Sequence, residues 1–204
     1  MEKGFLIVIS GFSGAGKGTV VKKLVEKYGY SLSISATTRA PREGEENGRE
    51  YYFKTEAEFQ NLIDYNGFIE WAQYVDNYYG TPRKFVEKEM AEGRDVILEI
   101  EVQGAMNVKQ QYPDSIHIFV SAPDVQSLKS RLEERGTESE AVIAKRLKRA
   151  SEEADDMKEY DYIVINGDIE SCVDTINSII VSNKCLKNNN LGFMENIKQE
   201  LKAL

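Results

Sequence analysis

The chain has 204 residues, of which 41% are hydrophobic and 29% are charged, a composition typical of one globular domain with room for an inserted lobe. A formal net charge of −8 argues against a surface that binds nucleic acid, so no nucleic-acid partner is expected. The sequence contains no apolar run long enough to predict a membrane span, and its acidic N-terminus does not resemble a secretory signal. The two cysteines, Cys172 and Cys185, form no disulfide framework. Together these observations favour a cytoplasmic location.

The first elements are an apolar strand over 5–9, a glycine-rich loop and a helix over 18–28. A short alternating run predicts a second strand over 32–35. The pattern then changes to short aromatic strands, one at 51–53 and a hairpin over 67–79, with a helix between them that Thr55 and Glu58 open as a capping box. This stretch, 35–81, is predicted to be a separate lobe inserted at the ligand-binding edge of a sheet, and it is called the inserted lobe below.

Beyond the inserted lobe, apolar strands again alternate with amphipathic helices. Thr81 followed by Pro82 predicts a helix that runs to about residue 92, with Pro82 at its first helical position. The later elements are predicted, in chain order, as a strand over 95–101, a helix over 102–111, a strand over 115–122, helices over 124–135 and 138–157, a strand over 161–166 and a helix over 168–185. Alternation of this kind predicts a three-layer α/β fold with a parallel sheet and right-handed crossovers.

The division of the chain follows from these elements. The core is predicted to comprise 1–34 and 82–183, and the tail 184–204 follows a break rich in Lys and Asn. Leu191, Met194, Ile197, Leu201 and Leu204 form an apolar stripe at helical spacing in this tail. The tail is therefore predicted to be a helix that packs on its own subunit or on a partner subunit, and a homo-oligomer is possible.

The loop "SGFSGAGKGT" at 10–19 carries the first functional motif. Glycines let backbone N–H groups turn inward around phosphate oxygens, the following helix adds its partial positive charge, and Lys17 supplies a cation to the outer phosphates. The usual pattern has Ser or Thr directly after the lysine, whereas this chain has Gly18 and a hydroxyl only at Thr19. That variation resembles the loop of nucleoside monophosphate kinases, which implies a P-loop fold and ATP contacts from Gly11, Phe12, Ser13, Gly14, Ala15, Gly16, Lys17, Gly18 and Thr19.

A second series of motifs is more specific. The segment "SATTRAPREGEENGREYYF" at 35–53 is followed by "EWAQY" at 70–74, "YYGTP" at 78–82, "LEIEVQGA" at 98–105, "RLEERGTES" at 131–139, "AKRL" at 144–147 and "YDYIVIN" at 160–166. In this order and spacing they resemble the guanylate kinase family over nearly all of 5–183. The resemblance implies an ATP-dependent kinase that phosphorylates GMP or dGMP in purine nucleotide metabolism, with a helical lid over about 127–157.

The inserted lobe then supplies the acceptor site. Arg39 and Arg42 flank the rigid Pro41, and guanidinium groups can grip a phosphate bidentately. Tyr51 and Tyr79 can donate O–H groups to the same phosphate. A carboxylate can accept from both N1–H and N2–H₂ of guanine, and the resemblance gives that role to Glu70, with Ser35 beside it. Gly80 and Thr81 lie close to these residues in the pattern.

The acidic pair and the arginines complete the predicted site. Glu99 and Glu101 are predicted to end the buried strand on one face, where they serve either Mg²⁺, together with Thr19, or the guanine edge, and the family more often has Asp at the second position. Arg149 has no secure counterpart in the family and is predicted to be a surface charge. The resemblance assigns catalytic arginines of the lid and an adenine contact to Arg131, Arg135, Arg146 and Asn166.

Two other functions remain open from the sequence. Some domains of this type are protein-binding modules that have lost residues of the phosphate-binding loop, and other kinases phosphorylate different small substrates on the same fold. Lys17 with its flanking glycines favours an enzyme, and Glu70 with Ser35, Arg39 and Arg42 favours guanine.

Overall fold

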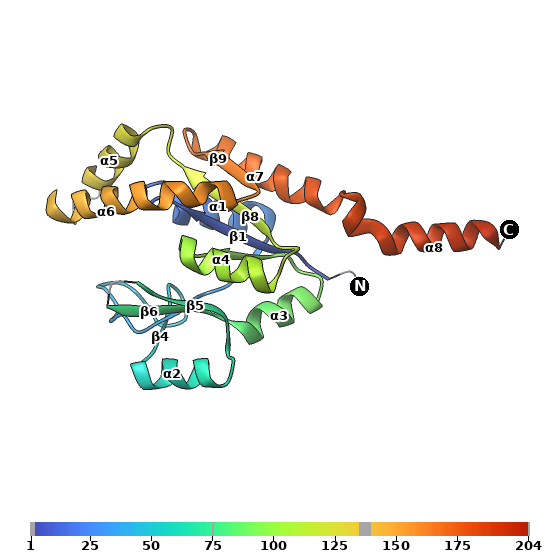
Figure 1. Ribbon diagram of the computed structural model, residues 1–204, viewed down its shortest axis with the longest axis horizontal. Coiled ribbons are helices and arrows are strands. Elements are labelled where there is room, and N and C mark those ends of the chain that lie inside the picture. Colours follow the sequence, from blue (N-terminus) through green and yellow to red (C-terminus); the bar gives the residue numbers. More distant parts are fainter. Residues whose placement is uncertain (1–2, 75, 135–139, 204) are drawn as a thin grey trace.

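The computed structural model of the protein describes residues 3–74, 76–134 and 140–203. A parallel sheet with strand order β2-β7-β1-β8-β9 forms its centre (Figure 1). In that order the strands are Ser31–Leu32, Val96–Glu99, Leu6–Gly11, Ile116–Ser121 and Tyr162–Ile165. Every residue of β1 is buried, as expected for a central strand of a sheet that is covered on both faces.

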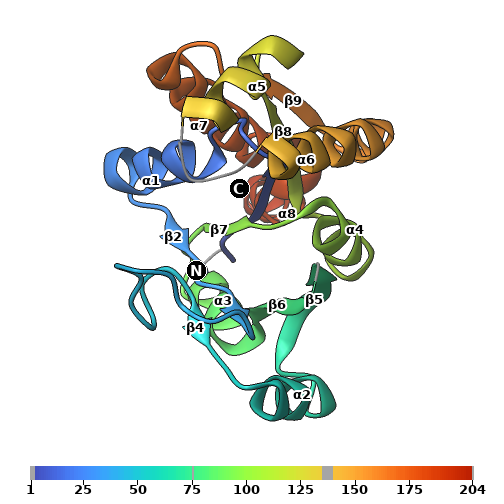
Figure 2. The ribbon, with the colours of Figure 1, turned by 90° about the vertical axis from the view of Figure 1, so that its left-hand side faces the viewer.

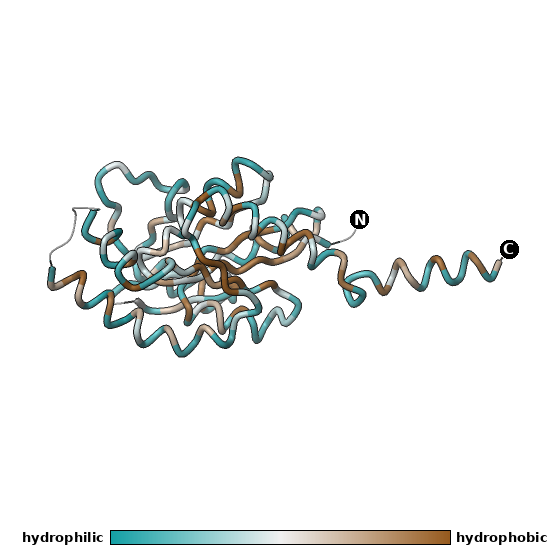
Figure 3. Tube along the Cα trace, turned by 90° about the horizontal axis from the view of Figure 1, so that it is seen from above, coloured by the Kyte–Doolittle hydropathy of each residue, from teal (hydrophilic) through white to brown (hydrophobic). Residues whose placement is uncertain are grey.

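Helices cover the two faces of this sheet. α1 (Lys17–Tyr28) and α7 (Ile169–Lys184) pack against each other on one face, and α4 (Val102–Gln111) packs against β1 from the other (Figure 2). α3 (Arg83–Ala91) lies beside β7. The hydropathy colouring shows the apolar residues concentrated in the strands at the centre (Figure 3). This arrangement confirms the predicted α/β fold and brings the carboxyl ends of β1 and β7 to one edge of the sheet.

The inserted lobe has a small sheet of its own, with strand order β4-β3-β6-β5. Its strands in that order are Tyr52–Phe53, Ala36–Thr37, Asn77–Pro82 and Phe68–Tyr74, and α2 (Glu56–Asp64) packs below them. Both hydrogen bonds of the predicted capping box are present, because Thr55 accepts from the Glu58 backbone N–H and Glu58 accepts from the Thr55 backbone N–H. A separate small core of Ala36, Phe59 and Phe68 supports the lobe, and Trp71 lies half-exposed on β5.

Several predicted boundaries are wrong. The expected strand over 32–35 is interrupted, because Leu32 ends β2 in the large sheet while Ala36 begins β3 in the small one. Pro82 ends β6 and caps α3 instead of occupying its first helical position. β7 ends at Glu99, so Glu101 is not a strand residue and instead stands at the N-cap of α4. The strands β2 and β7 end sooner than the sequence pattern indicates, whereas α3 begins one residue later.

Two helices form an arm above the edge of the large sheet at which the carboxyl ends of β1 and β7 lie. α5 (Val125–Glu134) begins after Asp124, whose side chain accepts the Ser127 backbone N–H and so caps the helix. α6 (Glu140–Glu153) is shorter than the predicted 138–157 helix, because the chain tightens into a 3₁₀ helix over Ala154–Glu159. Arg135, a predicted catalytic arginine of the lid, lies outside the described residues.

The C-terminal tail extends away from the rest of the molecule (Figures 1 and 3). A 3₁₀ helix over Lys187–Asn190 leads into α8 (Leu191–Lys202), which has no buried residue. It exposes Phe193 and the four members of the predicted apolar stripe that the structure describes, Leu191, Met194, Ile197 and Leu201. The tail is therefore helical as predicted, but α8 does not pack on its own subunit. None of the helices in the described ranges is both long and apolar enough to span a membrane.

Candidate active site

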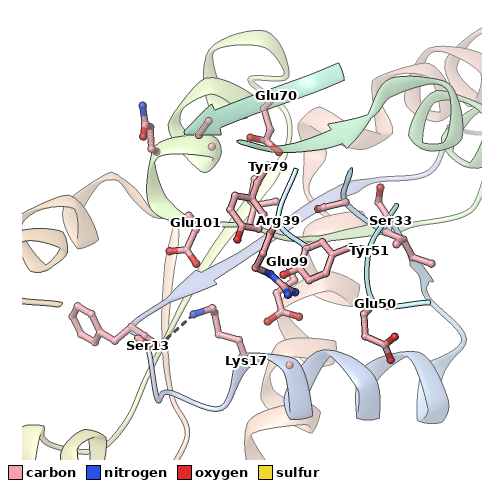
Figure 4. Close-up of a pocket in the computed structure, with 18 of the residues that line it drawn as sticks. Ser13, Lys17, Ser33, Arg39, Glu50, Tyr51, Glu70, Tyr79, Glu99 and Glu101 are labelled. Atoms are coloured by element: carbon pink, nitrogen blue, oxygen red, sulfur yellow. Dashed lines mark hydrogen bonds between the residues drawn. The ribbon is translucent and has the colours of Figure 1, made fainter. Parts of the chain in front are cut away.

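A cavity of about 430 Å³ opens between the phosphate-binding loop, the inserted lobe and α6 (Figure 4). This volume lies within the range of small-molecule sites. Predicted residues from these three regions and from the end of β7 line it together. They are Phe12, Ser13, Gly14, Gly16, Lys17, Gly18, Ser35, Arg39, Arg42, Tyr51, Glu70, Tyr79, Glu99, Glu101 and Arg146.

The phosphate-binding loop connects β1 to α1. Gly14 and Gly16 adopt left-handed backbone angles with φ of 89° and 87°, which residues with a side chain rarely adopt, and Gly16 is the N-cap of α1. Lys17 Nζ donates to the carbonyls of Gly11 at 2.6 Å and Phe12 at 3.3 Å. The loop therefore bends around its own lysine ammonium, and the start of α1 faces the cavity with unsatisfied backbone N–H groups.

Three side chains fix the loop from outside. Asn166 Nδ2 donates to the Ala15 carbonyl at 2.8 Å, and Arg131 donates to the Asn166 carbonyl at 2.8 Å. Arg146, on α6, donates to Ser13 Oγ at 2.7 Å. Asn166 and Arg131 thus lie behind the loop, outside the cavity lining, whereas Arg146 reaches it from the arm above.

The segment of the inserted lobe that carries Arg39 and Arg42, called the basic loop below, faces the phosphate-binding loop across the cavity. The Arg39 guanidinium lies over the Tyr51 ring, 5.4 Å from its centroid, and the Tyr51 and Tyr79 rings meet edge to face at 5.9 Å. Burial, and then the nearby Glu99 carboxylate, raise the pKa of Tyr51 to about 12. Tyr51 therefore keeps its O–H at neutral pH and can donate it to an anion between Arg39 and Lys17.

Glu70 is the most buried charged group of the lining, with 6% of its surface exposed. Thr81 Oγ1 donates to Glu70 Oε1 at 2.6 Å. Burial raises the pKa of Glu70 to about 7, although the Thr81 hydrogen bond opposes that shift. Gly104, in the first turn of α4, provides the space for this carboxylate, because a Cβ there would lie 2.4 Å from Glu70 Oε2.

Glu99, the last residue of β7, and Glu101, two residues later, point to different parts of the cavity. The Glu99 carboxylate lies beside the start of α1, 3.6 Å from where a Cβ of Gly18 would be. Glu101 is exposed at the N-cap of α4, and Figure 4 shows its carboxylate turned away from Glu70. The predicted common face of the two residues is therefore wrong, because Glu101 follows the end of the strand.

Comparison with known proteins decides the family. The family model described as guanylate kinase matches residues 3–183. A guanylate kinase of Caldanaerobacter subterraneus subsp. tengcongensis is 48% identical over 200 residues, which cover 98% of this chain and 97% of that protein. The chain belongs to the guanylate kinase family.

Further relatives agree with this family. The guanylate kinase of Bacillus subtilis is 48% identical over 183 residues, 89% of this chain and 90% of that protein. The crystal structure of guanylate kinase from Anaplasma phagocytophilum superimposes with a TM-score of 0.75 at 32% identity, covering 92% of this chain and 89% of that one. The guanylate kinase family confirms the P-loop fold and the enzyme class predicted from the motifs, an ATP-dependent nucleoside monophosphate kinase.

Other residues of this guanylate kinase chain fall differently from expectation. Arg149, predicted to be a surface charge, lines the cavity and pairs with Glu153 at 2.8 Å. Gly104, Glu45 and Glu153 also line it, and sequence reasoning missed all three, although Gly104 and Glu45 stand inside the quoted motifs. Predicted residues that the structure describes outside the lining are Gly11, Ala15, Thr19, Gly80, Thr81, Arg131 and Asn166.

Proposed function

We propose that this cavity binds ATP at the phosphate-binding loop and GMP or dGMP in the inserted lobe, and transfers the γ-phosphoryl group to give ADP and GDP or dGDP. One observation carries the proposal: a buried carboxylate, Glu70, shares a single cavity with the basic loop of Arg39 and Arg42 and with Lys17. These are three separate binding functions, for a base, a monophosphate and a polyphosphate.

The base is recognised by Glu70. In its ionised form the carboxylate accepts from the N1–H and N2–H₂ edge of guanine, while Thr81 occupies Oε1 from behind. Ser35 lines the same cavity and supplies a hydroxyl beside the base. Adenine offers no matching pair of donors, so it would leave the buried carboxylate without partners, a large penalty at a site of this kind.

The acceptor phosphate lies between the basic loop and the phosphate-binding loop. Arg39 and Arg42 neutralise its charge, and Tyr51 and Tyr79 donate O–H groups to its oxygens. None of these contacts uses the 2′-hydroxyl of the sugar, which supports acceptance of dGMP. The phosphate oxygen is itself the nucleophile, so the reaction needs no strong general base.

Transfer then depends on position and charge. The acceptor oxygen attacks the γ-phosphorus in line, the bond to the β-phosphate oxygen breaks, and the negative charge moves to the departing ADP. Lys17 and Arg146 neutralise this charge from the loop and from α6, with Arg131 and Arg135 as further predicted contributors. Because α5 and α6 lie over the cavity edge, their closure would exclude water and limit ATP hydrolysis.

A magnesium ion fits the oxygen donors at this site. The Glu99 carboxylate lies beside the start of α1, where Thr19 supplies a hydroxyl, and Glu101 follows nearby. Within the described ranges no cluster of three or more His, Cys, Asp or Glu side chains could hold a metal by itself. Glu99 would therefore hold the ion together with nucleotide phosphates and water, and the ion would neutralise phosphate charge. Glu101 and Thr19 stay predicted ligands, because Glu101 points to another part of the cavity and Thr19 lies outside its lining.

A location in the cytoplasm and a possible homo-oligomer complete the proposal. Both cysteines are unpaired, with Cys172 buried and Cys185 exposed, a pattern that suits a reducing compartment. The exposed apolar stripe of α8 is compatible with a partner subunit.

A coupled assay of ADP formation tests the function. We expect rapid turnover with GMP and dGMP and little with AMP, UMP or CMP at equal concentration. Equal rates with all four bases would contradict the guanine assignment and favour a kinase of another small substrate. Failure of ATP to bind in calorimetric titration would instead favour a protein-binding module.

A further inference from the structure

Glu45 links the two arginines of the basic loop. Its Oε1 and Oε2 atoms each lie 2.9 Å from Arg39 Nη2, and Oε2 also accepts the backbone N–H of Arg42 at 2.7 Å. The Glu45 backbone N–H in turn donates to the Arg42 carbonyl at 3.1 Å. One carboxylate therefore fixes the side chain of the first arginine and the backbone of the second.

This contact is shielded from water. The side chains of Arg39 and Glu45 are 16% and 17% exposed, far less than the other ion pairs of the same loop, where Arg49 is 52% exposed. Burial raises the pKa of Glu45, but the Arg42 backbone N–H and the Arg39 guanidinium outweigh that effect, so its pKa lies below the ordinary value. Glu45 is consequently ionised throughout the neutral range and remains a partner for Arg39.

The guanidinium of Arg39 is restrained from several directions. Nη1 donates to the Ala40 carbonyl at 2.7 Å, Nη2 is bound by Glu45, and the plane lies 5.4 Å from the Tyr51 ring centroid and 5.8 Å from that of Phe53. Among the residues that the structure describes, the Nε–H of Arg39 has no hydrogen-bond partner. A long side chain that would otherwise lose rotamer freedom on binding is thus already ordered, with a donor left for a ligand.

A carboxylate beside Arg39 could simply occupy the place of the acceptor phosphate, but the position of Glu45 within its own turn argues against that role. Gly44 adopts a φ of 83°, and its carbonyl accepts from Arg49 Nη2 at 2.5 Å, so the turn is closed on both sides of Glu45. A carboxylate that only occupied the phosphate position would not need the Arg42 backbone bond. Glu45 is part of the fold of the loop that presents both arginines.

We infer that Glu45 is a positioning residue for the acceptor phosphate: it orders the Arg39 guanidinium and the backbone at Arg42 before the nucleotide binds. This inference rests on the proposed function. It predicts that loss of the Glu45 charge weakens GMP binding through Arg39, while ATP binding at the other side of the cavity is unaffected. The opposite role, competition with phosphate for Arg39, predicts tighter GMP binding in the same variant.

The test compares Glu45→Gln with Glu43→Gln. Both variants remove one negative charge from the same loop, but Glu43 is exposed and makes no hydrogen bond or ion pair within the described residues. We expect Glu45→Gln to raise KM for GMP by about 10- to 100-fold and to leave KM for ATP within about twofold, as for misplacement of a single binding group. Glu43→Gln should leave both constants within about twofold.

A double-mutant cycle separates positioning from general damage. In an Arg39→Ala background, Glu45→Gln should change KM for GMP by less than about threefold, because the guanidinium that Glu45 orders is gone and the amide oxygen of the glutamine can still accept the Arg42 backbone N–H. An unchanged or lowered KM for GMP in the single variant, an equal rise in KM for ATP, or a full effect in the Arg39→Ala background would each overturn the inference. Absence of GMP turnover in the unmodified chain would refute the proposed function instead, and equal melting temperatures of the variants exclude unfolding as the cause.

Discussion

The phosphate-binding loop and the inserted lobe contribute to one cavity by different physical means. The loop at 11–19 offers backbone N–H groups as its binding groups. Two glycines with left-handed backbone angles, Gly14 and Gly16, turn these amides inward, and the fully buried strand β1 anchors the loop. The inserted lobe presents side chains instead, supported by a small core of Ala36, Phe59 and Phe68. Its Arg39 guanidinium donates to the Glu45 carboxylate, and its Glu70 carboxylate accepts a hydrogen bond from Thr81.

This difference determines how each region responds to change. A loop of amides on a rigid strand binds any polyphosphate tail, so damage to it should remove activity with every acceptor. A site of oriented side chains distinguishes one base from another, so damage there should be selective for GMP. The following predictions test this contrast, beginning with the largest effect.

Lys17→Met is expected to have the largest effect. The only side-chain cation of the phosphate-binding loop is lost, and contributions of this kind to phosphoryl transfer are on the order of 10³-fold or more in kcat. Lys22→Met is the matched control, since Lys22 lies on the same helix but is 76% exposed and only 3.9 Å from Glu26. A coupled assay measures both, and a loss confined to KM for GMP would contradict the division between the two regions.

Glu70→Gln should be selective for the acceptor. The amide keeps the shape of the side chain but replaces one acceptor oxygen with a donor that faces the guanine N–H groups, so kcat/KM for GMP should fall by about 10²–10⁴. KM for ATP should stay within about twofold. Glu56→Gln, an exposed change on α2 of the same lobe, provides the control. Unchanged GMP kinetics in Glu70→Gln would refute its role in base recognition.

Gly104→Ala tests the same carboxylate through its neighbour. A Cβ at this position would lie 2.4 Å from Glu70 Oε2, so the carboxylate must move and KM for GMP should rise by about 10- to 100-fold. Gly192→Ala on α8 is the control, because nothing lies within 4 Å of its added Cβ. Equal kinetics of the two variants would show that Glu70 can shift without loss.

The pH dependence of stability is a further consequence of Glu70 burial. Its pKa is raised to about 7 in the folded state from an ordinary value of 4.5, so the folded state binds the proton more tightly and loses stability as pH rises from 4.5 to 7. The free energy of unfolding of the unmodified chain relative to Glu70→Gln should fall by up to about 3 kcal/mol between pH 4.5 and pH 8. Urea unfolding of both proteins measures this difference.

Taking that difference removes an opposite contribution. Burial lowers the pKa of His117 to about 4, so the free energy of unfolding that depends on His117 decreases as pH falls below about 6.5. This effect is the same in both proteins and cancels in the difference. A difference that does not depend on pH would mean that Glu70 is not protonated in the folded state near neutral pH.

Removal of α8 should have the smallest effect. A chain that ends at Leu186 loses an exposed helix with no buried residue, so kcat and both KM values should remain within about twofold. Analytical ultracentrifugation of the full and shortened chains would show whether the apolar stripe joins two subunits. A large loss of activity in the shortened monomer would give α8 a role at the site.

Sequence reasoning predicted the glycine-rich loop and the capping box because their signals are local. The phosphate-binding loop needs glycines at fixed spacing between a buried strand and a helix, and the capping box at Thr55 needs only two residues three apart. The strand–helix alternation likewise predicted the parallel sheet. These features depend on neighbours in the chain, and their positions could be predicted to within a few residues.

Contacts between distant segments could not be predicted in the same way. The sequence pattern predicts Gly104 to be an ordinary helix residue, but in the fold Glu70 of β5 lies against it. The pattern likewise predicts Arg149 to be a surface charge, but α6 lies over the cavity and Arg149 lines it. The pKa of Glu70 depends on burial between α4 and the small sheet, which no local pattern encodes. The orientation of Glu101 could not be predicted either, because β7 ends two residues earlier than expected.

Trp71 gives the inserted lobe an optical reporter. It is the single tryptophan of the chain, follows Glu70 directly, and contacts Tyr78 with ring centroids 6.1 Å apart. Trp71 does not line the cavity itself, so under the proposed function its emission should report a movement of β5 when GMP binds beside Glu70, whereas the phosphate-binding loop contains no tryptophan. Occupation of the acceptor half could therefore be followed by fluorescence in real time, on unlabelled protein, while ATP is varied independently.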